Sequence, residues 1–342
     1  MTALAGIVTN SASGRDIRRL VTRASVFPNA EKSAMVQRTL SALGAVGVER
    51  VLAMTDLGGI AAGVVRAHQR AGRDTAAWPE VEFLDLPITE TASDTTAAVT
   101  AMVERGVGAI VVLGGDGTNR VVAGACGDVP LVSLSTGTNN VFPELREATV
   151  AGLAAGLVAT GRVPAGDVCR RNKMLVVDDG GRQELALVDV CATTHAFVAT
   201  RAVWEADSLR ALFVTFAEPD AIGLSAIAGL LRPVGRDEPI GLALELAPLA
   251  QARLRVRAPI GPGLVVDVGV DAVTPMAPGE RWPLPAGPGV IALDGEREIE
   301  ARGARPTVRL ELDGPRTIDV RRTLARAAQD GLLTDGAVPA QS

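Results

Sequence analysis

The residues best suited to do chemistry stand in a short loop at positions 114–118, Gly-Gly-Asp-Gly-Thr, directly after the apolar run Val107–Leu113. Glycines let the backbone approach a ligand closely, and a helix that begins at such a loop presents unpaired N–H groups that attract anionic oxygens. A helical pattern begins near Thr118 or Asn119. The spacing therefore predicts a phosphate-binding strand, loop and helix, with Asp116 as the acid of the loop.

A second polar loop, Leu134–Pro143, follows the apolar run Val129–Leu134 and again leads into a helical pattern. Parallel strands end at one edge of their sheet, where open α/β sheets bind ligands, so we expect the two loops to lie together. Asp-Gly is also a common hairpin signal, and this sequence contains six such pairs. Asp116 differs in following a buried type of strand and preceding a helix.

Extended and helical patterns alternate through the first half of the chain. Helical spacing follows Asn29, recurs from Ile60 and resumes after Asp94. This alternation predicts an α/β domain with a parallel sheet that is covered on both faces. The extended runs are Leu4–Val8, Val48–Met54, Val81–Leu86, Val107–Leu113 and Val129–Leu134.

The second half is expected to be rich in strands, after a long helix from about Pro143 to about Gly161. Residues 173–190 fit a hairpin around Asp179-Gly180-Gly181. We expect a helical stretch over Phe197–Leu212 and a loop or domain crossing over Pro275–Gly289. Further extended segments are Gly241–Leu246, Arg253–Arg257, Leu264–Val270, Val290–Leu293, Thr307–Leu312 and Thr317–Val320, and the tail after Asp330 is expected to fray.

Composition narrows the classes of function. The chain has 342 residues, 47% of them hydrophobic, and a net charge of -5 without a basic block, which argues against nucleic acid as a partner. No uninterrupted apolar run is long enough for a transmembrane segment, and the N-terminus lacks the pattern of a secretory signal. We therefore expect a cytoplasmic protein that binds small molecules, and a homo-oligomer stays open.

Several familiar sites do not fit. Cys126, Cys169 and Cys191 are far apart, which indicates reduced thiols, and His68 and His195 are too few for a histidine-based metal centre. Neither Lys32 nor Lys173 follows a glycine-rich run, as a P-loop requires. The loop after the first strand lacks the spaced glycines of a nicotinamide fingerprint.

Four strings of the sequence resemble the superfamily of NAD kinases, diacylglycerol kinases and sphingosine kinases. They are the loop 114–118, Gly137-Thr138-Asn139-Asn140, Asn10-Ser11-Ala12-Ser13-Gly14 and Leu293-Asp294-Gly295-Glu296. Within that superfamily, the fuller strings are most similar to the acetoin catabolism protein X family. The glycine-rich motif is specific to the superfamily and says little about the substrate.

The resemblance implies two domains with an active site between them. Residues 1–160 would form the nucleotide-binding α/β domain, 161–290 a β-rich acceptor domain, and 291–342 a segment that returns to the first domain. Asp116 would orient or deprotonate an acceptor hydroxyl, with ATP and Mg²⁺ as cofactors and metal ligands that the sequence leaves unknown. The residues that would bind the nucleotide are Gly114, Gly115, Gly117, Thr118, Asn119, Asn10, Ser13, Gly14, Thr138, Asn139 and Asn140.

The acceptor side departs from the pattern of NAD kinases. Their Asn-Glu pair corresponds to Val188-Asp189, so Asp189 keeps a carboxylate, or else it is a solvent-facing strand residue. Glu296 is an acceptor-side candidate, or else part of a hairpin turn. Arg120 would reach a phosphate or lie exposed at the start of a helix. Aromatic stacking residues are scarce, with Trp204 held open near the acceptor.

Three functions are consistent with these residues. The first is ATP-dependent phosphoryl transfer to a small hydroxyl compound, NAD or a relative of it. The second is a nucleotide-binding regulator that has lost turnover. The third is a lipid kinase, which would need an apolar acceptor cleft.

Overall fold

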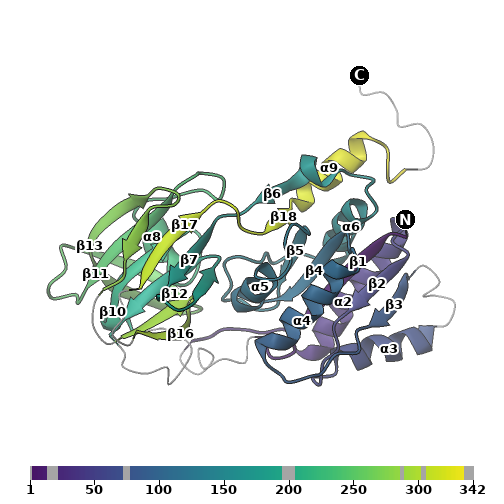
Figure 1. Ribbon diagram of the computed structural model, residues 1–342, viewed down its shortest axis with the longest axis horizontal. Helices are drawn as coiled ribbons and strands as arrows, with labels where there is room; N and C mark the ends of the chain where they lie inside the picture. The colour runs from purple at the N-terminus through teal and green to yellow at the C-terminus, as the bar shows by residue number, and fades with distance from the viewer. Residues whose placement is uncertain are drawn as a thin grey trace.

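The computed structural model describes residues 2–13, 22–71, 78–194, 205–285, 289–301 and 306–334. They form two domains, which lie side by side in Figure 1. The first is built on a parallel-rich sheet between helices and the second on antiparallel sheets, so the expected fold class is confirmed. The expectations for Gly14, His195 and Trp204 fall outside the described residues.

The first sheet has the strand order β3-β2-β1-β4-β5-β18-β6. All neighbours run parallel except β18 and β6. The central strand β4 is buried along its whole length, as its unbroken apolar run predicts. The strands are β1 (Leu4–Thr9), β2 (Arg50–Ala53), β3 (Glu80–Phe83), β4 (Ala109–Gly114), β5 (Leu131–Ser135), β6 (Cys169–Arg171) and β18 (Arg316–Ile318).

Helices cover both faces of this sheet. Side chains of α2, α3, α6 and α9 share one apolar core with it, and those of α4 and α5 share another. Every helix in the described ranges is too short or too polar to span a bilayer. The helices are α2 (Asn29–Ala45), α3 (Ile60–Ala71), α4 (Ala92–Glu104), α5 (Asp116–Ala123), α6 (Ala148–Ala159), α7 (Ala165–Val168) and α9 (Val320–Gln329).

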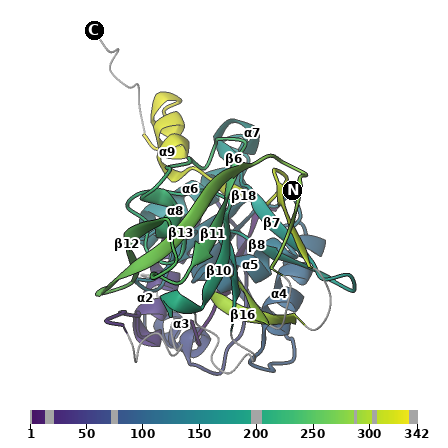
Figure 2. The ribbon, with the colours of Figure 1, turned by 90° about the vertical axis from the view of Figure 1, so that its left-hand side faces the viewer.

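The second domain packs two antiparallel sheets face to face. In Figure 2 the molecule is turned so that this domain faces the viewer. The larger sheet has the order β12-β13-β11-β10-β9-β15-β16, and the smaller one β14-β17-β7-β8. The larger sheet contains β9 (Asp189–Thr193), β10 (Leu209–Val214), β11 (Gly241–Ala247), β12 (Leu254–Gly261), β13 (Leu264–Met276), β15 (Gly289–Leu293) and β16 (Glu296–Ala301). The remaining elements are β7 (Met174–Asp178), β8 (Gln183–Ala186), β14 (Arg281–Pro283), β17 (Thr307–Glu311), the 3-10 turn η2 (Ala206–Ser208) and α8 (Ser225–Gly229).

The chain passes between the domains twice, from β6 to β7 and from β17 to β18. At this double crossing the Asn172 Nδ2 donates to the backbone oxygen of Pro315 at 2.8 Å and to the Thr317 Oγ1 at 2.9 Å. After the second crossing, α9 packs against the core that contains α6 (Figure 1). The boundaries at 160 and 291 stay a prediction, although strand order assigns 169–171 to the first sheet and 289–293, 296–301 and 307–311 to the sheets of the second domain.

The helix expected from Pro143 is placed wrongly, because it begins at Ala148. Glu144 instead bridges to β5: its N–H donates to the Ser133 oxygen at 3.1 Å, and its oxygen accepts from the Ser135 N–H at 2.8 Å. Glu147 then caps the helix by accepting from the N–H groups of its first turn. Pairing with a strand therefore overrides the preference of proline for a helix start.

Three other expectations need correction. The residues Leu209–Leu212, expected in a helix, begin strand β10, which is paired on both sides by β9 and β11. The expected loop Pro275–Gly289 contains the end of β13 and the edge strand β14. Val320, expected to end a strand, begins α9, because the Asp319 side chain caps that helix.

The three cysteines are thiols, as expected, and they differ in burial. Cys126 and Cys191 have no exposed surface, and burial raises the pKa of Cys126 to about 11. Cys169 is partly exposed, and burial also raises its pKa. Because the thiolate is the reactive form, we expect a thiol reagent at pH 7.5 to label at most Cys169, and slowly, in the native protein. Mass spectrometry should find all three labelled in denaturant; fast native labelling of Cys126 would contradict this burial.

Candidate active site

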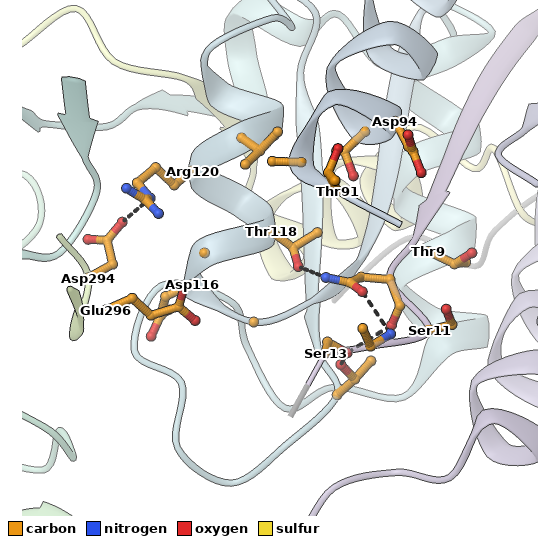
Figure 3. Close-up of a pocket in the computed structure, with 18 of the residues that line it drawn as sticks. Thr9, Ser11, Ser13, Thr91, Asp94, Asp116, Thr118, Arg120, Asp294 and Glu296 are labelled. Carbon is orange, nitrogen blue, oxygen red and sulfur yellow. Dashed lines mark hydrogen bonds and ion pairs between the residues drawn. The ribbon is translucent and has the colours of Figure 1, made fainter. Parts of the chain in front are cut away.

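A cavity of about 1270 Å³ lies where the two domains meet. The loops that follow β1, β4 and β5 line it from the first domain, and residues near β8 and β16 line it from the second. Figure 3 shows side chains from both domains converging on the start of α5. The loops that the sequence singled out therefore share one cavity at the carboxyl edge of the parallel sheet.

Glycines allow the tight course of the loop after β4. A Cβ atom on Gly114 would lie 2.5 Å from the Thr118 Cβ, and one on Gly115 would lie 2.7 Å from the Asn140 Oδ1. Gly115 stands at the N-cap of α5 without a side-chain cap, so the first amides of the helix have no acceptor within the helix. These amides and the helix dipole favour an anionic ligand at this end of the cavity.

Asp116 is the first residue of α5, and its carboxylate joins the two glycine-containing loops. Its Oδ1 accepts from the Phe142 N–H at 2.8 Å and from the Val141 N–H at 3.0 Å, and its Oδ2 lies 3.1 Å from the same Val141 nitrogen. The side chain also lines the cavity. The structure thus fixes the orientation of this acid with donors from the loop after β5.

The loop after β1 is attached to the same helix. The Asn10 Nδ2 donates to the Thr118 Oγ1 at 3.0 Å, and the Asn10 Oδ1 accepts from the Ala12 N–H at 2.9 Å. The Ser13 hydroxyl lies 2.9 Å from the Thr136 hydroxyl. These bonds hold the three loops in register around one end of the cavity.

Lys32 supports the first loop from beneath. Its side chain is only 1% exposed, and its Nζ donates to the Asn10 oxygen at 2.9 Å, the Ser13 Oγ at 2.8 Å and the Ser13 oxygen at 3.2 Å. Lys32 does not follow a glycine-rich run, so its sequence context predicts neither a P-loop lysine nor any other role. The available signal was its place on the apolar face of a helix, one turn before Met35 and Val36.

The second domain contributes the hairpin turn between β15 and β16. Asp294 and Gly295 both have positive φ, as a type I′ turn requires, so the hairpin interpretation of this motif is confirmed. The Asp294 carboxylate accepts from the N–H groups of Leu187 and Val188 at 3.0 and 2.8 Å, and it faces the Arg120 Nε at 3.7 Å. Complete burial raises the pKa of Asp294, and Arg120 and the amides oppose that shift. This ion pair joins α5 to the second domain.

Two family models match consecutive parts of the chain. The ATP-NAD kinase N-terminal domain matches residues 6–163, and the acetoin catabolism protein X C-terminal domain matches residues 172–322. Acetoin catabolism protein X of Cupriavidus necator is 43% identical over 341 residues, which cover 98% of this chain and 95% of that protein. The chain belongs to the acetoin catabolism protein X family. The expected superfamily is confirmed, and the match of the domain that carries the glycine loops supports kinase chemistry.

In this member of the acetoin catabolism protein X family, most of the residues expected to bind a nucleotide line the cavity. Glu296 does so as well, and its carboxylate oxygens lie 3.5 Å from the place that a Cβ on Gly117 would occupy. Figure 3 shows Asp116 and Glu296, from different domains, at the start of α5. The expected residues that line the cavity are Asn10, Ser13, Gly115, Gly117, Thr118, Thr138, Asn139 and Asn140.

Three of the expected residues do not line the cavity, and the first of them, Gly114, is the last residue of β4. Asn119 is fully buried, and its Nδ2 donates to the Gly115 oxygen at 2.9 Å, so it stabilises the start of α5 from behind. Asp189 is 4% exposed, and its Oδ1 accepts from the Gly295 N–H at 3.2 Å. The solvent-facing interpretation of Asp189 is therefore wrong, and its carboxylate positions the turn that carries Asp294.

Arg120 lines the large cavity in this family member and does not lie exposed at the start of a helix. Its side chain is 12% exposed, and its Nε lies 3.7 Å from the Asp294 carboxylate of the other domain, so its phosphate-binding role stays a prediction. Arg120 and Asp294 are too far apart in the sequence for their contact to be predicted from it. Within the described ranges, no three His, Cys, Asp or Glu side chains are grouped to hold a metal ion.

Proposed function

We propose that this protein transfers the terminal phosphoryl group of ATP to a hydroxyl of a small polar molecule, with NAD or a related dinucleotide as the first acceptor to test. The observation that carries the proposal is the position of Asp116, at the first turn of a helix whose amides line the cavity and opposite Glu296 of the second domain. Phosphoryl transfer depends on alignment and on neutralised charge more than on covalent chemistry, and these groups can supply both.

In the reaction, the acceptor hydroxyl oxygen bonds to the γ-phosphorus while the bond to the bridging oxygen of ADP breaks. Asp116 orients the hydroxyl and accepts its proton, which passes on to water. The amides at the start of α5 and the Thr118 hydroxyl bind phosphate oxygens, and Asn10 positions Thr118. Mg²⁺, held mainly by phosphate oxygens and water with Asp116 or Glu296 as a protein ligand, would neutralise the phosphate charge.

The dimensions and lining of the cavity support a second substrate of polar character. Its volume of about 1270 Å³ exceeds the roughly 300–1000 Å³ of a usual small-molecule site, which leaves room for a nucleotide and an acceptor. On the second-domain side, the lining includes Gln183, Glu184 and Glu296. These polar groups favour a hydroxylated, water-soluble acceptor over a lipid.

The test is an acceptor screen with the purified protein, ATP and Mg²⁺. We expect a phosphorylated product, detected by mass spectrometry, with NAD or with another polyhydroxyl compound, and release of ADP in equal amount. A product formed only with diacylglycerol vesicles would favour the lipid kinase instead. Calorimetry that shows ATP binding, together with no product from any acceptor, would favour the non-catalytic regulator.

A further inference from the structure

A second, smaller cavity is lined in part by Phe142, whose N–H group donates to the Asp116 carboxylate. Its volume is about 240 Å³, and it is bounded by β5, by Arg170 and Asn172 near the double crossing, and by the start of α9. Val141 and Phe142 connect the two sites: their N–H groups bind Asp116, and their backbone oxygens accept from Arg236 at 2.7 and 3.3 Å. Four arginines and two acids line it: Arg146, Arg170, Arg236, Arg321, Glu144 and Asp319.

The two acids are already engaged. Glu144 accepts from Arg146 at 3.0 Å, and Asp319 caps α9 by accepting from the Arg322 N–H at 2.9 Å. Two of the guanidinium groups are engaged as well, Arg146 with Glu144 and Arg236 with Glu218 at 3.1 Å, so Arg170 and Arg321 are the arginines that can bind a ligand. Two available guanidinium groups beside one cavity attract anions and repel cations.

Buried donors in this cavity have no acceptor. The Arg170 Nε and the Ser133 Oγ have no accessible surface and no hydrogen-bond partner among the described residues. The nearest acid to Arg170 is Asp237, 3.8 Å away and 79% exposed. Buried polar groups are usually satisfied by protein, water or ligand, so unpaired donors beside an arginine cluster indicate a place for acceptor oxygens.

We propose that this cavity binds a compact oxyanion with at least two negative charges, of the size of phosphate or pyrophosphate. Guanidinium groups match the geometry of phosphate oxygens with paired hydrogen bonds. The volume of about 240 Å³ lies below that of a typical site for a nucleotide-sized ligand, so the ligand must be small. The site is separate from the proposed nucleotide cavity.

The position of the site connects the ligand to both domains. Arg170 lies in β6 of the first sheet and Arg321 in α9, whereas Arg236 belongs to a loop of the second domain. Lys173 holds that loop by donating to the backbone oxygens of Gly235, Glu238 and Ile240 at 2.7–2.9 Å. An oxyanion bound by Arg170 and Arg321 lies beside Arg236, which holds the segment that positions Asp116.

The test is calorimetric titration of the whole protein with pyrophosphate, first alone and then in the presence of Mg²⁺ and a non-hydrolysable ATP analogue. We expect Arg321→Gln and Arg170→Gln each to weaken pyrophosphate binding by roughly tenfold, because each removes a charge-assisted contact. Arg321 is exposed, so its variant should keep the melting temperature of the wild type. Arg255→Gln, on a 62% exposed side chain of β12, is the matched control and should bind as the wild type does.

The oxyanion site and the proposed kinase activity can each be disproved without disproving the other. If both variants bind pyrophosphate as tightly as the wild type, or if Arg255→Gln weakens binding as much as they do, the arginine-lined site is disproved. Binding of the ATP analogue should be unchanged in Arg321→Gln, since that arginine does not line the larger cavity. Absence of kinase activity in the wild type would leave the pyrophosphate result intact.

Discussion

Replacing Asp116 by asparagine is expected to lower kcat for phosphoryl transfer roughly 10² to 10⁴-fold, the usual contribution of a well-placed acid or base. Asparagine keeps the shape of the side chain and one oxygen that can accept from the Phe142 N–H. It cannot accept the proton of a hydroxyl or offset the charge of Mg²⁺. The measurement is the initial rate with the acceptor found in the screen, or the rate of ATP hydrolysis by water.

Asp116 also clamps a loop, so the experiment must separate the two roles. Binding of the ATP analogue to Asp116→Asn should stay within a few-fold of the wild type, because the amides at the start of α5 remain. Asp128→Asn, which removes an exposed carboxylate paired with Arg171, is the control and should keep full activity. A variant at Asp116 that melts earlier yet keeps its kcat would show that this acid acts only as a clamp.

Replacing Lys32 by methionine is expected to reduce the free energy of unfolding by about 3 kcal/mol, since each buried acceptor left without a donor costs roughly 1–3 kcal/mol. Methionine fills the same volume but leaves the oxygens of Asn10 and Ser13 without this ammonium group. Because Asn10 and Ser13 line the larger cavity, affinity for ATP should fall as well. Urea unfolding and calorimetry measure the two effects.

Arg38→Met provides the comparison on the same helix. Arg38 forms ion pairs with Glu31 and Glu147, and its side chain is 41% exposed, so its loss should cost at most about 1 kcal/mol. Similar losses in the two variants would contradict the role given to Lys32. An unchanged affinity for ATP in Lys32→Met would show that the first loop does not contribute to nucleotide binding.

The parallel sheet could be predicted from the sequence because its strands are continuous apolar runs between helical patterns. Deviations arose where contacts distant in sequence decide the local structure. Glu144 pairs with β5 and delays the expected helix, and Leu209 becomes part of a strand because β9 and β11 lie beside it. A local preference of a few tenths of a kcal/mol does not withstand hydrogen bonds to a neighbouring strand, two of them at Glu144 and a whole ladder in β10.

The residues of the candidate site likewise divide into those that the sequence predicts and those that only the folded chain brings together. The glycine loops and Asp116 could be found because strand, loop and helix are adjacent in sequence. The pair of Arg120 and Asp294 and the contacts of Lys32 with the first loop depend on how the chain folds back. The sequence still held a signal for Lys32, because a lysine on the apolar face of a helix requires buried acceptors for its ammonium group.

The double crossing makes the first domain discontinuous in the chain. Strand β5 pairs with β4 on one side and with β18 on the other, and β18 is made by the ribosome only after the entire second domain. Until then the part of β5 around Leu131, which Glu144 does not cover, is an open edge of the kind that promotes association between chains. Synthesis of the last strand and of α9 closes that edge, so a protein that ends prematurely after β17 lacks the piece that completes its nucleotide-binding half.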